Sequence, residues 1–144
     1  MNGNLPTKTA VEKARETARW AETMMKWTAS FANARRWRMV AFRGPGGQES
    51  RGVVDVIAIR KDQTDPRDKV LKRGDLFDII LIQIKGGGAA KPKEADKERL
   101  LKVKKKYGAR DVVLFSWKKN QERQFSILGK DNDWHGIAPE DLFA

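Results

Sequence analysis

Two apolar runs separated by a charged loop form the clearest pattern of hydrophobic and polar positions in the chain. Residues 53–60 read VVDVIAIR and residues 76–85 read LFDIILIQIK, and both runs are rich in the β-branched residues that favour strands. Residues 61–75 between them are polar and contain Asp65 and Pro66, a turn-forming pair. The pattern predicts two strands joined by a solvated loop, with residues 76–85, apolar on both faces, in the centre of a sheet.

Polar residues interrupt these two strands where packing alone gives no reason for them. Successive side chains of a strand point to opposite faces. One face of residues 76–85 therefore carries Phe77, Ile79, Leu81, Gln83 and Lys85, and the other carries Ile80, Ile82 and Ile84. If the two strands pair, Asp55 lies beside Gln83 and Lys85, and such groups are costly to bury unless they form a site. Asp78, near the start of the strand and on its other face, is interpreted as an entry residue.

The rest of the chain predicts two helices and three further strands. Residues 6–34 have the period of a helix with a wide apolar face, and residues 91–109 that of a second helix, which Gly108 ends. The narrow apolar stripe of the second helix consists of Leu100, Leu101, Val103 and Tyr107. Residues 35–43, 111–117 and 124–128 are the remaining strands. The tail is expected to fold back through Trp134, Ile137 and Phe143.

This order, α-β-β-β-α-β-β, predicts an α/β fold in which helices flank a mixed central β-sheet. A chain of 144 residues is long enough to bury a core without disulfides, and it contains no cysteine. No apolar run approaches the roughly 20 residues that span a bilayer, and residues 1–10 lack the apolar centre of a signal peptide. We therefore expect a single domain over residues 1–144, in the cytoplasm and without a membrane partner.

The chain is strongly basic, with 30 Lys and Arg against 19 Asp and Glu and a formal net charge of +11. Such an excess favours polyanionic partners, most often nucleic acid, and a merely soluble basic protein is the alternative. Arg43 and Arg51 stand at the two ends of a glycine-rich loop, and Lys104 and Lys105 lie in a run of lysines on the second helix. We expect these four residues to contact a nucleic-acid backbone; a plain hairpin connection and a solvated helix face are the alternatives.

The element order, taken together with the polar residues, resembles the core of the PD-(D/E)-x-K nuclease superfamily. Asp55 stands on the second strand, and Gln83 and Lys85 stand one residue apart on the third; the resemblance covers roughly residues 22–128. The chain is most similar to the Holliday-junction-resolvase and Mrr-like branches, in which an acid on the first helix precedes these two strands. The resemblance implies a restriction-endonuclease-like core and a single nuclease-like domain.

The same resemblance implies a metal-dependent DNA endonuclease. Asp55, the side-chain oxygen of Gln83 and the carbonyl of Ile84 would bind Mg²⁺, with Mn²⁺ as a substitute. Lys85 would orient the attacking water or stabilise the developing charge. Phosphodiester hydrolysis independently calls for a metal that neutralises the phosphate and activates water, and Mg²⁺ prefers oxygen ligands of this kind.

One position departs from the commonest pattern of that superfamily, because Gln83 stands where an acid is usual. The neutral amide removes one charge, worth up to about 4 kcal/mol at about 4 Å and an effective dielectric of about 20, so weaker metal binding is expected. Glu22, at the border of the apolar face of the first helix, is the acid best placed to restore a charged ligand. Glu16 is the second choice.

Three functions fit these residues. The first is a metal-dependent endonuclease that acts on double-stranded or branched DNA, as a homodimer if it cuts both strands. The alternatives are a catalytically inactive nucleic-acid-binding module on the same fold and a basic RNA-binding α/β domain. Asp55 can also cap a backbone turn or pair with an arginine, and Gln83 and Lys85 can simply leave the core for solvent.

Overall fold

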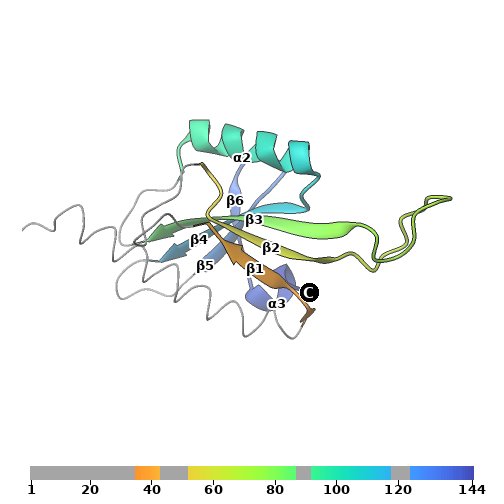
Figure 1. Cartoon of the computed structure of the whole chain (residues 1–144). Coiled ribbons are helices and arrows are strands. Elements are labelled where there is room, and N and C mark those ends of the chain that lie inside the picture. Colours follow the sequence, from red (N-terminus) through yellow and green to blue (C-terminus); the bar gives the residue numbers. More distant parts are fainter. Residues whose placement is uncertain (1–34, 43–51, 87–91, 118–123) are drawn as a thin grey trace, which may run out of the picture.

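The structure, a computed structural model, describes residues 35–42, 52–86, 92–117 and 124–144 (Figure 1). Within these ranges the strands are β1 (Arg38–Ala41), β2 (Val56–Lys61), β3 (Phe77–Gly86), β4 (Asp111–Trp117), β5 (Gln124–Leu128) and β6 (Trp134–Ile137). The helices are α2 (Glu94–Tyr107) and α3 (Pro139–Leu142). The first predicted helix, residues 6–34, and most of the glycine-rich loop lie outside the described residues.

The described strands form one mixed sheet in the order β1-β2-β3-β4-β5-β6. β3 lies in its interior, antiparallel to β2 and parallel to β4, and the other neighbours are antiparallel. A parallel pair needs a crossover connection, and α2 supplies it between β3 and β4. Figure 1 shows α2 over one face of the sheet and α3 over the other. The predicted α/β class and the interior position of the third strand are therefore confirmed.

The alternation predicted for β3 is also confirmed, because its two faces belong to different apolar layers. Ile80, Ile82 and Ile84 pack on the side of α3, in a cluster with Trp37, Val56, Ala58, Val113, Phe115, Phe125, Leu142 and Phe143. Leu81 packs on the side of α2, with Val53, Leu100, Ala109, Val112 and Leu128. Gln83, two residues after Leu81, therefore faces the layer under α2.

Helix α2 differs from its prediction in the residues that it buries. Leu100 is fully buried and Val103 packs against the same layer, but Leu101 is exposed and Tyr107 is 72% exposed. Leu101 is rotated by about 100° from Leu100 around the helix, so a helix that packs along one line cannot bury both. Gly108 ends the helix in the left-handed conformation, as predicted, with its N–H bonded to the carbonyl of Lys104. Neither helix that the structure describes has the length and apolar character to cross a membrane.

The tail folds back across the sheet as expected and adds two elements, β6 and α3, that the sequence pattern does not predict. The indole Nε1 of Trp37 donates to the carbonyl of Phe143 at 2.9 Å, and the two rings meet edge to face. Both side chains are buried, with exposures of 1% and 0%. The segment before β1 and the end of the chain are thus packed together.

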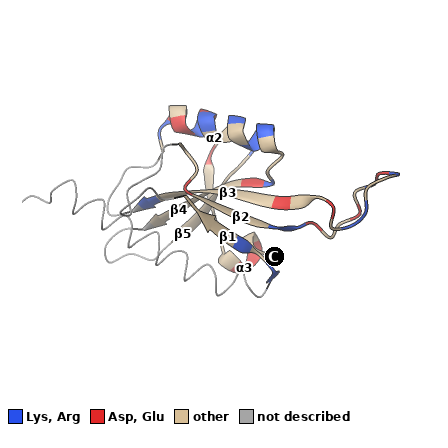
Figure 2. Ribbon diagram, in the orientation of Figure 1, with Lys and Arg blue, Asp and Glu red and all other residues tan. Residues whose placement is uncertain are grey.

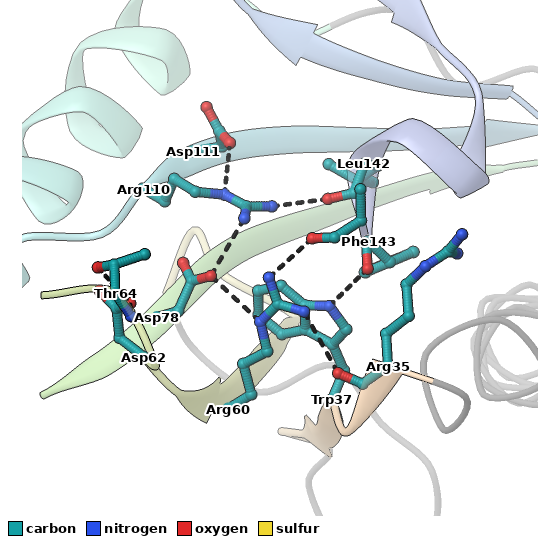
Figure 3. Close-up of polar contacts among 11 residues, drawn as sticks. Arg35, Trp37, Arg60, Asp62, Thr64, Asp78, Arg110, Asp111, Leu142 and Phe143 are labelled. Carbon is teal, nitrogen blue, oxygen red and sulfur yellow. Dashed lines mark hydrogen bonds and ion pairs between the residues drawn. The ribbon is translucent and has the colours of Figure 1, made fainter. Parts of the chain in front are cut away.

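Two arginines hold this segment through one carboxylate (Figure 3). Arg60 on β2 and Arg110 before β4 both bind Oδ2 of Asp78, at 3.3 Å and 3.1 Å. Arg60 also donates to the carbonyl of Ala144 at 2.7 Å, and Arg110 donates to that of Leu142 at 2.6 Å. Asp78 is therefore the centre of an ion-pair network and not the simple entry residue expected from the sequence.

Replacement of Asp78 by alanine is predicted to lower the free energy of unfolding by about 2 kcal/mol. The side chain of Asp78 is only 13% exposed, so its loss leaves two guanidinium groups without their shared partner. Partial exposure of both arginines keeps the loss below that of a fully buried pair. Urea unfolding measures the change.

Glu98→Ala is the matched control for this prediction. Glu98 pairs with Lys102 at 3.9 Å, and both side chains are more than 70% exposed. In this variant the free energy of unfolding is expected to change by less than about 0.5 kcal/mol. Equal losses in the two variants would contradict the role assigned to Asp78.

Candidate metal and phosphate site

Asp55 joins three strands at the point where regular pairing between β2 and β3 stops. Its Oδ2 accepts a hydrogen bond from the Ile84 N–H at 2.7 Å, and its own N–H donates to the carbonyl of Ile82 at 2.9 Å. Its carbonyl accepts from the Phe42 N–H at 3.0 Å. Because Ile82 is already the partner of Val56, two residues of β2 face one residue of β3, as in a β-bulge. This explains why β2 begins at Val56, three residues later than predicted.

Gln83 is a polar side chain inside the layer under α2. It is only 7% exposed, and its Oε1 has no hydrogen-bond partner within the part of the chain that the structure describes. Leaving a buried acceptor unpaired costs about 1–3 kcal/mol, and such groups in native proteins call for a functional explanation or an unseen ligand. The oxygen of Gln83 is the clearest such group in the predicted site.

Ile84 and Lys85 complete the β3 side of the site. The N–H and C=O of one strand residue point to the same side of the strand, so the Ile84 carbonyl is directed towards β2, where Asp55 binds the N–H. Lys85 is half-buried and lies on the same face as Gln83. The carboxylate of Asp55 thus contacts the peptide unit that lies between the predicted amide ligand and the predicted ammonium group.

These groups fit a small hard cation by their chemistry. A carboxylate, an amide oxygen and a main-chain carbonyl are the donors that Mg²⁺ takes from proteins, usually with only one or two carboxylates and several retained waters. No group of three or more acidic or histidine side chains suited to a metal occurs among the described residues. The site therefore has the donor types for Mg²⁺ but a low negative charge.

Several predicted site residues cannot be compared with this geometry. Glu22, the second choice Glu16, Arg43 and Arg51 all lie outside the described residues, and their roles stay predictions.

Lys104 and Lys105 lie at the opposite end of the sheet from Asp55. They belong to the last turn of α2, close to Arg110, whose N–H bonds the carbonyl of Ile79. Ile79 is four residues before Gln83 on β3, a separation of about 13 Å along a strand. Figure 2 shows Lys and Arg residues, in blue, at several turns of α2. The two lysines are separate from the candidate metal ligands, and their predicted contact with a nucleic-acid backbone would be made at a distance from them.

The sequence patterns missed the network of Arg60, Asp78 and Arg110. Asp78 is 18 residues from Arg60 and 32 residues from Arg110. No local spacing indicates partners so far apart, because strand pairing brings Arg60 opposite Asp78 and the helix crossover brings Arg110 beside them. The available signal is a carboxylate among the apolar residues of the first half of the strand, 76–82.

Gln83→Met is predicted to leave the free energy of unfolding unchanged or to raise it by up to about 1 kcal/mol, because the variant removes an unpartnered buried oxygen at similar volume. Urea unfolding of the metal-free protein measures this, with Gln124→Met at an exposed position of β5 as the control. A loss of more than about 1 kcal/mol specific to Gln83→Met would mean that the amide oxygen has a partner in the folded protein.

No family model and no curated protein match this chain. Among solved structures, the fold is similar to that of a Holliday junction resolvase from the archaeal hyperthermophile Archaeoglobus fulgidus. The similarity covers 83% of this chain and 99% of that protein, with 9% sequence identity and a TM-score of 0.48.

Proposed function

We propose that the chain is a metal-dependent DNA endonuclease that hydrolyses phosphodiester bonds with a metal-activated water. The observation that carries the proposal is the buried, unpartnered Oε1 of Gln83, two residues before Lys85. The Asp55 carboxylate accepts a hydrogen bond from the N–H of Ile84, the residue between them. The net charge of +11 supports a polyanionic substrate. The resemblance to PD-(D/E)-x-K nucleases rests on the same residues, and a homodimer of single nuclease-like domains belongs to the proposal.

Each residue of the site has a separate part in this proposal. Asp55, the Gln83 oxygen and the Ile84 carbonyl hold Mg²⁺ or Mn²⁺, and Glu22, or Glu16 in its place, adds a second carboxylate. When bound, the ion neutralises the phosphate and lowers the pKa of an attacking water. Lys85 orients that water and stabilises the charge that develops on the phosphate.

Asp55→Asn and Lys85→Gln are each predicted to reduce nicking of a supercoiled plasmid by about 100-fold or more in Mg²⁺ or Mn²⁺. Asparagine can still accept the Ile84 hydrogen bond, so the first variant removes the charge of Asp55 while keeping its structural contact. Glutamine removes the ammonium of Lys85 at similar length. Gel electrophoresis measures the nicking rate.

Asp133→Asn makes the same chemical change as Asp55→Asn at an exposed position of the β5–β6 turn, and it should nick at the wild-type rate. Wild-type nicking by Asp55→Asn would refute the assignment of this carboxylate as a metal ligand. A circular dichroism spectrum unchanged from wild type shows that each variant is folded.

Gln83→Glu is predicted to tighten Mg²⁺ binding by about tenfold or more, because it adds a full charge beside the ion. The metal-free variant should be less stable than wild type, since burial opposes ionisation of the new carboxylate. Thermal unfolding with increasing Mg²⁺, without nucleic acid, measures both effects. Gln63→Glu, at an exposed position of the β2–β3 hairpin, is the control, and an equal Mg²⁺ response in the two variants would rule out Gln83 as a ligand.

A second candidate is a nucleic-acid-binding module without catalysis, and one observation favours it. The Asp55 Oδ2 already accepts the Ile84 N–H, so a structural role accounts for that carboxylate without a metal. The module would bind DNA with a strong salt dependence and nick no substrate, including branched ones. A preference for duplex RNA over duplex DNA in the same titration would instead identify an RNA-binding domain.

A further inference from the structure

A basic hollow of about 920 Å³ opens at the end of the sheet from which the β2–β3 hairpin extends. Six of the described residues that line this hollow, which we call the arginine hollow, are cationic: Arg35, Arg36, Arg38, Arg60, Lys61 and Arg110. In Figure 2 the basic ends of β1 and β2 lie side by side at the base of the hairpin. The hollow lies outside the candidate metal site, and the roles proposed above do not use it.

Two of the described residues that line the arginine hollow are acidic, and both already accept hydrogen bonds. Asp78 binds Arg60 and Arg110, as shown in Figure 3. Asp62 accepts hydrogen bonds from the hydroxyl and the N–H of Thr64, which hold the pKa of its carboxyl below the ordinary value of 3.8. Two anions against six cations leave the hollow with a clear excess of positive charge.

Three of the six cations are exposed and have no carboxylate partner within the described residues: Arg36, Arg38 and Lys61. Arg guanidinium groups match the geometry of phosphate oxygens, and Lys adds a point charge. Arg36 stands in the left-handed backbone region, with φ 65°, where arginine is uncommon. The hollow thus presents three cations that no carboxylate of the described ranges neutralises, and such cations suit a phosphate backbone.

Two of these cations lie on the same face of the sheet as Gln83. Arg38 is opposite Ile59, which is opposite Ile79, and Lys61 is opposite Phe77. Directly paired residues share a face, and Ile79 and Phe77 alternate with Gln83 on β3. Helix α2 covers β3 on this face, whereas Val40 and Phe42 beside it are exposed. A polymer that runs beside α2 along β1 therefore passes from Phe42, which is bonded to Asp55, to Arg38 at the arginine hollow.

The distance along the strands between Gln83 and the arginine hollow corresponds to a few base pairs of duplex DNA. Ile79 and Phe77 precede Gln83 by four and six residues, or about 13 Å and 20 Å along the strand. At about 3.4 Å per base pair, these lengths equal roughly four and six base pairs of duplex.

The exposed face of β1 beside this path carries no acidic residue. Val40 and Phe42 are each 43% exposed, and residues 38–42 read RMVAF. No carboxylate on this strand would repel a phosphate that lies between the metal site and the hollow.

We propose that the arginine hollow binds the sugar–phosphate backbone of the same DNA whose phosphate is cut at Asp55, about four to six base pairs from the cleaved bond. This rests on the proposed endonuclease function and adds a length requirement to it. A substrate must continue as duplex for about six base pairs on the side of the hollow to gain full affinity.

The first test removes these three cations together, in Arg36→Gln/Arg38→Gln/Lys61→Gln. Lys69→Gln/Lys72→Gln/Lys130→Gln is the control, with the same loss of charge at exposed positions outside the hollow. Fluorescence anisotropy measures duplex DNA binding at several salt concentrations without divalent metal. The slope of log K against log salt should become shallower by about 2.7 in the first variant, since each phosphate contact contributes about 0.9, and by less than about 1 in the control.

The second test varies the length of duplex beyond the cleaved bond from two to ten base pairs. Affinity and nicking by the wild type should rise up to about six base pairs, and this dependence should be lost in the hollow variant. If the wild type binds no DNA, the endonuclease proposal and this inference both fail. If the wild type binds and nicks DNA but the hollow variant keeps the salt slope of the control, only the hollow assignment is overturned, and its charge serves another anionic partner.

Discussion

The hydrogen bond from the Ile84 N–H to the Asp55 carboxylate determines how the central strands end. Regular pairing of β2 and β3 stops at Val56 and Ile82, and beyond it a side chain takes the place of a main-chain acceptor. A carboxylate differs from a carbonyl because it carries a charge and further lone pairs. The hydrogen bond between Ile84 and Asp55 therefore also places a negative charge beside β3. The fold and the proposed chemistry depend on the same side chain.

Gln83, unlike Asp55, serves the proposed site without stabilising the fold. Leu81, which precedes it on the same face of β3, belongs to the apolar layer under α2, and an apolar side chain at position 83 would extend that layer without an unpartnered oxygen. Perturbed or unsatisfied polar groups of this kind concentrate where proteins bind ligands, because binding offsets a cost that the free fold has to carry. Asp55 stabilises the sheet at its site, whereas Gln83 weakens the core beside it.

Local patterns predicted the parts of the structure that depend on local geometry. The alternation of residues 76–85 identified both faces of β3. The strands β4 and β5 have the predicted bounds, and Gly108 ends α2 in the left-handed conformation that glycine favours. The exposure of Leu101 and Tyr107 depends on how many residues of α2 can reach the sheet, which a helical period alone does not specify. The sequence also placed Asp55 beside β3, but its bond to the Ile84 main chain depends on a one-residue slip in pairing. Arg60, Asp78 and Arg110 meet only after distant strands have assembled.

The packing of Trp37 against Phe143 also affects the order in which the chain can fold. These partners are 106 residues apart, so the ribosome has to synthesise every element from β2 to α3 before Trp37 can contact Phe143. Contacts of such long range form late and slowly compared with local ones. Until then Trp37 lacks its aromatic partner, and apolar side chains that stay exposed before folding is complete make a chain prone to aggregation.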